Sequence, residues 1–225
     1  MSTIAATARP SGGWTAADWL IPAGLLALAF IPVVAGAFRV TALIGHAEIT
    51  VDNIRFFASP IPVLLHIVSV TLYSVVGAFQ FSPGIRRRFG AWHRRAGRIL
   101  VGAGLVAALS GLWMATFYAI VPADHPLLHA LRLLFGSAMA ISIILGFSAI
   151  RRGNVAVHQA WMRRAYAIGL GAGTQGLVQI PQVMIFGKPD SITLALLMGS
   201  AWILNLSVAE WLIRRQRRRL PPRTS

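Results

Sequence analysis

The sequence predicts an all-α, polytopic membrane protein with six transmembrane helices, in which spans two to five form a central four-helix bundle. The chain of 225 residues is 56% hydrophobic and 12% charged, far from the composition of a soluble globular domain. Six apolar runs are each about 20 residues long, enough to cross a hydrocarbon core of roughly 30 Å. Because backbone amides in lipid must be bonded within their own segment, we expect each run to be a helix.

The predicted spans follow one another with short connections, so that neighbours in sequence are expected to be antiparallel. They are residues 19–40, 61–82, 99–121, 127–150, 166–186 and 192–213. Residues 1–18 are predicted to be a flexible cytoplasmic N-terminus, 19–213 the membrane domain, and 214–225 a basic cytoplasmic tail. Pro181 is expected to kink the fifth span.

The basic residues lie mostly on one side of this arrangement. Of the 21 Lys and Arg residues, six lie within 86–98, four within 151–164 and six within 214–223, segments that six spans place on the same side. Short loops rich in Lys and Arg stay cytoplasmic, so both termini are expected inside the cell. The net charge of +15 is then best matched by anionic inner-leaflet lipids. The shortness of these loops and their position beside the spans exclude nucleic acid as a partner.

Several classes of site are excluded by composition. The chain has no cysteine, which excludes disulfides, thiolate-held iron–sulfur clusters and covalently attached haem. It contains no P-loop, Rossmann, metalloprotease or hydrolase motif. The six acidic residues all lie outside the middle of the spans, so a carboxylate proton relay is not indicated.

One histidine in each of four consecutive spans points to a cofactor. His66 and His129 lie near the outer ends of spans two and four, and His93 and His158 lie at the inner ends of spans three and five. Antiparallel helices bring 66 near 129 and 93 near 158 when these spans lie diagonally across the bundle. Two imidazoles on opposite faces of a macrocycle are the ligands that a b-type haem takes. The sequence therefore predicts two haems, or a single outer haem.

Cations and aromatic residues beside these histidines fit the same hypothesis. Arg132 stands alone among apolar neighbours and can pair with a haem propionate or an anionic substrate, or extend to the headgroups. Arg94, Arg95 and Arg163 are further candidates for propionates, although their position also serves topology. Trp92 and Trp161 can stack on a haem edge or belong to the interfacial belt.

Small residues follow the inner histidines at helical spacing. On span three these include Gly97, Gly104 and Gly111, and on span five Gly169, Gly173 and Gly176. Such faces can leave room for a porphyrin, or they can serve close helix packing alone. Three amides, those of Gln175, Gln179 and Gln182, share one face of span five and can either bond neighbouring helices or line a quinone-like pocket.

Two segments carry a resemblance to a known family. GAFQFSPGIRRRFGAWHRRAGRIL and IRRGNVAVHQAWMRRAYA resemble the signature of a bacterial membrane-protein family with domain of unknown function 2306, over residues 66–182. The resemblance implies a multi-span inner-membrane protein. The architecture is also similar to that of transmembrane di-haem cytochromes b, which move electrons from ascorbate or quinol. Similarity to these proteins implies the pairs His66 with His129 and His93 with His158, although no ascorbate-site motif is present.

These observations lead to one expected function and two alternatives. We expect a b-type haem protein that transfers electrons across the membrane between a quinol or cytoplasmic donor and an outer acceptor, which would make it a transmembrane oxidoreductase. The first alternative is a haem-free transporter or binder with an outward-facing site made by His66, His129 and Arg132. The second is a structural or assembly protein whose histidines bond across helices.

Overall fold

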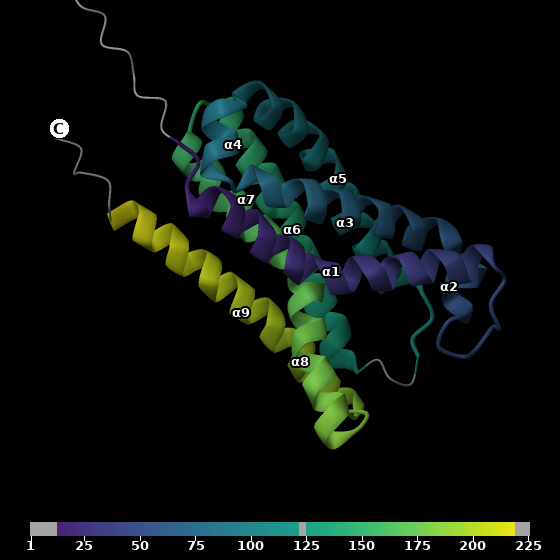
Figure 1. Ribbon diagram of the computed structural model, residues 1–225. Helices are drawn as coiled ribbons and strands as arrows, with labels where there is room; N and C mark the ends of the chain where they lie inside the picture. The colour runs from purple at the N-terminus through teal and green to yellow at the C-terminus, as the bar shows by residue number, and fades with distance from the viewer. Residues whose placement is uncertain (1–12, 122–124, 219–225) are drawn as a thin grey trace, which may run out of the picture.

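The computed structural model describes residues 13–121 and 125–218, which form helices joined by turns (Figure 1). The predicted lead at residues 1–12 and the end of the predicted tail at 219–225 lie outside the described residues. In chain order the helices are α1 (Ala16–Ile44), α2 (Ile54–Ala58), α3 (Pro60–Gln80), α4 (Pro83–Arg88), α5 (Gly90–Phe117), α6 (Pro126–Arg151), α7 (Val155–Gly169), α8 (Gly171–Phe186) and α9 (Ser191–Arg218).

Five of the described helices are long and apolar enough to cross a membrane, namely α1, α3, α5, α6 and α9. They overlap five of the six predicted spans, although α5 begins at Gly90 rather than at the expected residue 99. The sixth, predicted at residues 166–186, is divided between α7 and α8, which are 15 and 16 residues long. The interruption is at Leu170, between Gly169 and Gly171, whereas α8 continues through Pro181. The helix break therefore lies between two glycines and not at Pro181, where only a kink was expected.

The predicted four-helix bundle is present, with α3, α5, α6 and α7 as its members. Helix α3 packs on α5, α5 on α6, α6 on α7, and α7 also touches α3. Helices α3 and α6 are therefore diagonal to one another, as are α5 and α7, which is the order that the alternation of histidines predicted. Helix α1 crosses the bundle against α3 and α8, and α9 packs along α6, α7 and α8 (Figure 1).

Two tyrosines fill the middle of this bundle. Tyr73 of α3 and Tyr166 of α7 are both buried, with ring centroids 5.6 Å apart. The Tyr166 hydroxyl donates a hydrogen bond of 2.6 Å to the Ser74 carbonyl oxygen. Glycines make room for the rings, since an added Cβ would lie 2.5 Å from the Tyr166 ring at Gly77 and 2.6 Å from the Tyr73 ring at Gly104. These two glycines thus allow the tyrosine rings to pack closely against α3 and α5.

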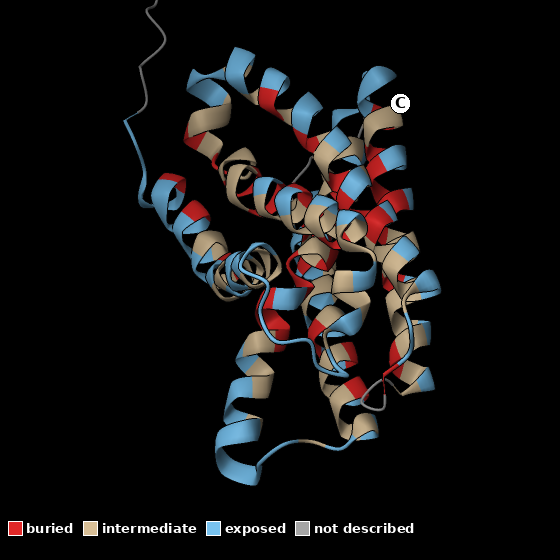
Figure 2. Cartoon of the chain, turned by 90° about the vertical axis from the view of Figure 1, so that its right-hand side faces the viewer, coloured by how far each residue is buried: buried red, intermediate tan, exposed pale blue. Residues whose placement is uncertain are grey.

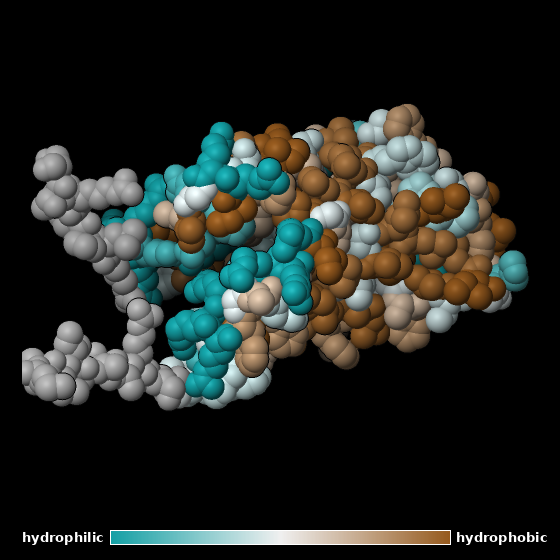
Figure 3. Space-filling view, turned by 90° about the horizontal axis from the view of Figure 1, so that it is seen from above, coloured by the Kyte–Doolittle hydropathy of each residue, from teal (hydrophilic) through white to brown (hydrophobic). Residues whose placement is uncertain are grey.

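The arginine clusters lie at one end of the molecule, here called the arginine-rich end, which contains α4, the start of α5, the α6–α7 turn and the end of α9. Figure 3 shows hydrophilic residues gathered at this end and hydrophobic residues over the remainder of the face in view. Helix α1 also begins here, at Ala16 rather than at the expected residue 19. The Asp18 side chain is buried, where its carboxylate accepts hydrogen bonds from Thr15 N (2.8 Å) and Gly84 N (2.5 Å). The hydrogen bond from Gly84 N to this carboxylate joins the start of α1 to α4.

The outward faces of the long helices suit a lipid environment. Many large apolar side chains are exposed, among them Phe30, Phe38, Leu134 and Ile203. Buried residues lie mainly where the helices meet and exposed residues lie on the outer faces (Figure 2). An exposed apolar surface of this extent is normal only where lipid or another apolar partner covers it.

We predict that Gly173→Ala destabilises the protein by about 1–3 kcal/mol, because the added methyl group meets the Leu28 backbone carbonyl, which is not free to move aside. The matched control is Gly24→Ala in α1, where nothing lies within 4 Å of the added methyl group. The free energy of unfolding of this control should exceed the wild-type value by no more than about 1 kcal/mol, because alanine favours the helix over glycine. Unfolding in mixed detergent micelles compares the two, and equal stability of both variants would contradict the α1–α8 packing.

Candidate functional site

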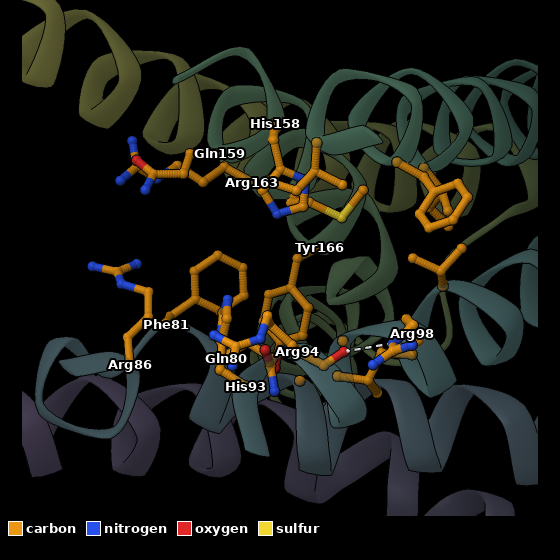
Figure 4. Close-up of a pocket in the computed structure, with 18 of the residues that line it drawn as sticks. Gln80, Phe81, Arg86, His93, Arg94, Arg98, His158, Gln159, Arg163 and Tyr166 are labelled. Atoms are coloured by element: carbon orange, nitrogen blue, oxygen red, sulfur yellow. Dashed lines mark hydrogen bonds between the residues drawn. The ribbon is translucent and has the colours of Figure 1, made fainter. Parts of the chain in front are cut away.

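A cavity of about 520 Å³, here called the first cavity, opens at the arginine-rich end between α3, α5, α6 and α7. Its volume lies within the range of small-molecule and cofactor sites. Figure 4 shows two walls facing each other across the opening, with His158, Gln159 and Arg163 on one side and Gln80, Arg86, His93, Arg94 and Arg98 on the other. The deep part is apolar and is lined by Tyr73, Phe81, Leu100, Val101, Ile143, Phe147, Met162 and Tyr166.

His158 is held with one ring nitrogen available. Its Nδ1 lies 2.9 Å from the Gly146 carbonyl oxygen, and since a carbonyl only accepts, Nδ1 must carry the hydrogen. The neutral ring then has its lone pair on Nε2. A hydrogen bond from Nδ1 to a backbone carbonyl is the usual support for a histidine whose Nε2 binds a metal, because it fixes the tautomer and the ring orientation.

His93 faces the same cavity from α5, the helix diagonal to α7. Its Nδ1 is buried and has no hydrogen-bond partner among the described residues, and the same is true of Gln80 Nε2. The two imidazoles lie close enough to interact electrostatically. Buried polar atoms without partners are uncommon and call for an explanation. Both residues line the first cavity, so its wall contains two buried polar atoms without partners among the described residues.

Five arginines surround the opening of the first cavity, namely Arg86, Arg94, Arg98, Arg151 and Arg163. Burial lowers the pKa of the Arg86 guanidinium from its ordinary value, and the adjacent Arg87 lowers it further. Arginine remains protonated in proteins nonetheless. The described lining contains no Asp or Glu, so the opening is an electropositive rim that suits an anionic group.

A second cavity of about 410 Å³ lies beyond the tyrosines, toward the end opposite the arginine-rich end. Its described lining includes His66, Arg55, Arg132 and Gln175 together with apolar residues from α1, α3, α5, α6, α8 and α9. His66 Nδ1 lies 2.8 Å from the Ala107 carbonyl oxygen and 3.2 Å from Ser110 Oγ. By the same reasoning as for His158, its Nε2 holds the lone pair.

The predicted ligand pairs have different outcomes. His93 and His158 line one cavity together. His66 lines the second cavity, but the described lining of that cavity does not include His129, which is partly buried on α6. Arg94 and Arg163 lie at the first cavity and Arg132 at the second. The described lining of neither cavity includes Arg95, Trp92 or Trp161.

Some lining residues were not singled out from the sequence as site residues. From the sequence, Arg86, Arg98 and Arg151 are explained by topology alone, and nothing singles out Gln159. Tyr73 and Gln80 could have been found, because they follow His66 on the same face of α3 at intervals of seven residues. Of the three amides on span five, Gln175 lines the second cavity and its Nε2 donates to the Met198 carbonyl oxygen (3.3 Å).

Comparison with known proteins agrees with the helical, apolar architecture. No curated protein and no solved structure matches the chain. Residues 63–213 match the family described as predicted membrane protein (DUF2306). The matched segment extends from α3 to α9 and includes all four histidines of the bundle. The chain belongs to the DUF2306 family of predicted membrane proteins.

Proposed function

We propose that the protein binds one b-type haem in the first cavity and serves transmembrane electron transfer. The observation that carries the proposal is the pair of histidines from diagonal helices on one apolar cavity, His93 with a buried nitrogen that has no partner among the described residues and His158 with Nε2 available. A haem, when bound, would supply one-electron chemistry that the side chains of this chain lack.

The residues around the cavity have separate roles in this proposal. His93 and His158 would hold the haem iron, and the carbonyl of Gly146 orients His158. Arg86, Arg94, Arg98 and Arg163 are the partners for the two propionates at the rim. Tyr73 and Tyr166 form an apolar floor that excludes water from the ring. A quinol or a cytoplasmic reductant is the class of electron donor that we propose.

We propose the first cavity as the haem site in place of the outer histidine pair, His66 and His129. A second haem between His66 and His129 would need both rings on one cavity. The described lining of the second cavity contains His66 but not His129. A single haem beside the arginine-rich end is therefore the stoichiometry that the cavities support.

We predict that the purified protein reconstitutes with one haem per chain, and that His158→Ala and His93→Ala each lose most of it, because each substitution removes one of the two imidazoles that would hold the iron. Haem content by pyridine haemochrome assay and the α-band of the dithionite-reduced protein measure this. Added imidazole should restore part of the spectrum of His158→Ala by occupying the vacated space.

Two variants that each remove a histidine outside the first cavity serve as controls. His129→Ala and His46→Asn should keep the full haem content, since neither residue lines the first cavity. Asn suits position 46, where φ is 49°. Loss of haem from His129→Ala with retention in His158→Ala would reverse the assignment, and absence of haem from wild type would remove the proposed function.

We further propose that α7 and α8 together form a sixth crossing, that both termini are cytoplasmic, and that the membrane is the bacterial inner membrane. The proposal rests on the arginine-rich end, which holds the α4 and α6–α7 segments and the end of α9, because positively charged short segments stay inside. Broken helices are tolerated at membrane depth where protein covers the free backbone groups.

Single cysteines test this topology cleanly, because the chain has no cysteine of its own. Arg152 and Lys188 are exposed at opposite ends of the α7–α8 segment. In intact cells with permeable outer membranes, an impermeant maleimide should label Lys188→Cys, and should label Arg152→Cys only after the inner membrane is opened. Labelling of both from the same side would show that α7 and α8 do not cross.

A further inference from the structure

The second cavity lies apart from the proposed haem site, beyond the two buried tyrosines. Tyr73 and Tyr166 line the first cavity and do not belong to the described lining of the second. The second cavity has a volume of about 410 Å³, which is enough for a small-molecule ligand. Its described lining comes from the bundle and also from α1, α8 and α9, so a ligand there would contact both parts of the protein.

One hydrogen-bond acceptor of this cavity is the His66 imidazole on α3. Its Nδ1 lies 2.8 Å from the Ala107 carbonyl oxygen, so Nδ1 carries the hydrogen and Nε2 carries the lone pair. The Ser110 hydroxyl group donates to the Val106 carbonyl oxygen (2.6 Å) and therefore accepts from Nδ1, at 3.2 Å. Among the described residues, hydrogen bonds to the ring involve Nδ1 only, which leaves Nε2 to accept from a ligand.

A second acceptor is the side-chain amide of Gln175 on α8, a buried residue that lines the same cavity. Its Nε2 donates to the Met198 carbonyl oxygen (3.3 Å), and because a carbonyl only accepts, this bond fixes which end of the amide carries the nitrogen. Among the described residues the amide bonds through Nε2 alone. The Gln175 Oε1 atom is therefore an acceptor that a ligand can use.

The two acceptors lie at different depths along α1. The residue after the histidine, Ile67, packs on Gly36 of α1, where an added Cβ would lie 3.0 Å from the Ile67 side chain. The residue after the glutamine, Gly176, packs on Ile31 of α1, with the corresponding distance 2.9 Å. These two positions are five residues apart on α1, about 7.5 Å of helix rise. A ligand that reaches both acceptors therefore needs its two donors well separated.

The walls around these acceptors are largely apolar. Phe135 and Trp202 line the cavity and their rings stack with centroids 4.8 Å apart. Flat aromatic ligands pack well against such rings. Three methionines also belong to the described lining, namely Met114, Met139 and Met198. Methionine side chains adjust to flexible chains of differing shape, so the walls suit a ring that carries a hydrocarbon tail.

We propose that the second cavity binds a lipophilic 1,4-hydroquinone in its reduced form, with one hydroxyl group donating to His66 Nε2 and the other to Gln175 Oε1. The two donors of this diol lie at opposite ends of a flat ring, as acceptors at different depths require. The oxidised quinone has carbonyl oxygens that only accept. The proposal assigns no part of this binding to Arg55 or Arg132, which also line the cavity.

This inference rests on the proposed function for the use of the ligand, since it gives the quinol donor a place in the protein. Binding of the hydroquinone itself does not require haem. The site can therefore be tested on haem-free protein, and the result is independent of whether the first cavity holds haem.

Displacement of radiolabelled decyl-1,4-hydroquinone from the purified, haem-free wild-type protein under argon tests the proposal. We expect saturable binding that the unlabelled compound displaces. Three analogues with the same tail should displace it at least about tenfold less well, because a site built for hydroxyl donors rejects ligands that lack them or misplace them. The dimethyl ether and the oxidised quinone have no donors, and the decylcatechol isomer has its two hydroxyl groups on adjacent carbons.

Two variants test the named acceptors. His66→Phe and Gln175→Leu each remove one acceptor and should weaken hydroquinone binding by about fivefold or more, the effect of one buried hydrogen bond. Their affinity for the dimethyl ether should not fall, because this analogue donates no hydrogen bond. The matched controls are His129→Phe and Gln179→Leu, the same substitutions outside the described lining, and both should bind the hydroquinone as wild type does.

Absence of saturable binding, equal displacement by any of the three analogues, or wild-type hydroquinone affinity in either acceptor variant would each overturn the proposal. A parallel fall in the affinity for the dimethyl ether would overturn it as well, because the two side chains would then only maintain the cavity. If the variants do not fold, the comparison of the four ligands on wild-type protein decides. Hydroquinone binding by a protein that takes up no haem would remove the proposed function and leave this site, and haem uptake without hydroquinone binding would do the reverse.

Discussion

The contact on which the structure depends most is the packing of Tyr73 and Tyr166 against glycine faces at the centre of the bundle. In lipid, helices gain little from hydrophobic burial, so close contact and internal hydrogen bonds must hold them together. The two rings fill the space between α3, α5 and α7, and the Tyr166 hydroxyl bonds to the Ser74 carbonyl oxygen across the helices. This layer fixes the diagonal order of the bundle and divides its interior into two cavities.

The division gives the two ends different chemistry. The cavity at the arginine-rich end has two histidines, an electropositive rim and buried nitrogens without partners among the described residues. The described lining of the other cavity has one histidine and two arginines within a largely apolar wall. Outside the cavities, polar side chains of α8 and α9 bond to each other, as Thr174 Oγ1 does to Asn205 Oδ1 (2.8 Å). Contacts between helices therefore satisfy some of the polar residues of the membrane domain.

Much of this arrangement was predictable because it depends on local sequence. Hydropathy and length identify the spans, and alternation of His66, His93, His129 and His158 in an up-and-down bundle predicts which helices are diagonal. The rotation of each helix was not predictable. His129 is absent from the described lining of the second cavity, although Arg132, three residues further along α6, belongs to it. The break at Leu170 also depends on tertiary contacts, since α1 and Trp202 approach Gly173 and Gly171 too closely for any side chain.

The central claim is that two imidazoles on opposite walls of the first cavity share one ligand. Electron paramagnetic resonance of the oxidised, haem-loaded protein tests it most directly, because the signal reports the iron's axial ligands without any mutation. The account predicts a low-spin ferric signal of the kind that two imidazole ligands give. A purely high-spin signal from the loaded protein would show that the histidine rings of the first cavity do not meet on one iron, and would contradict the account.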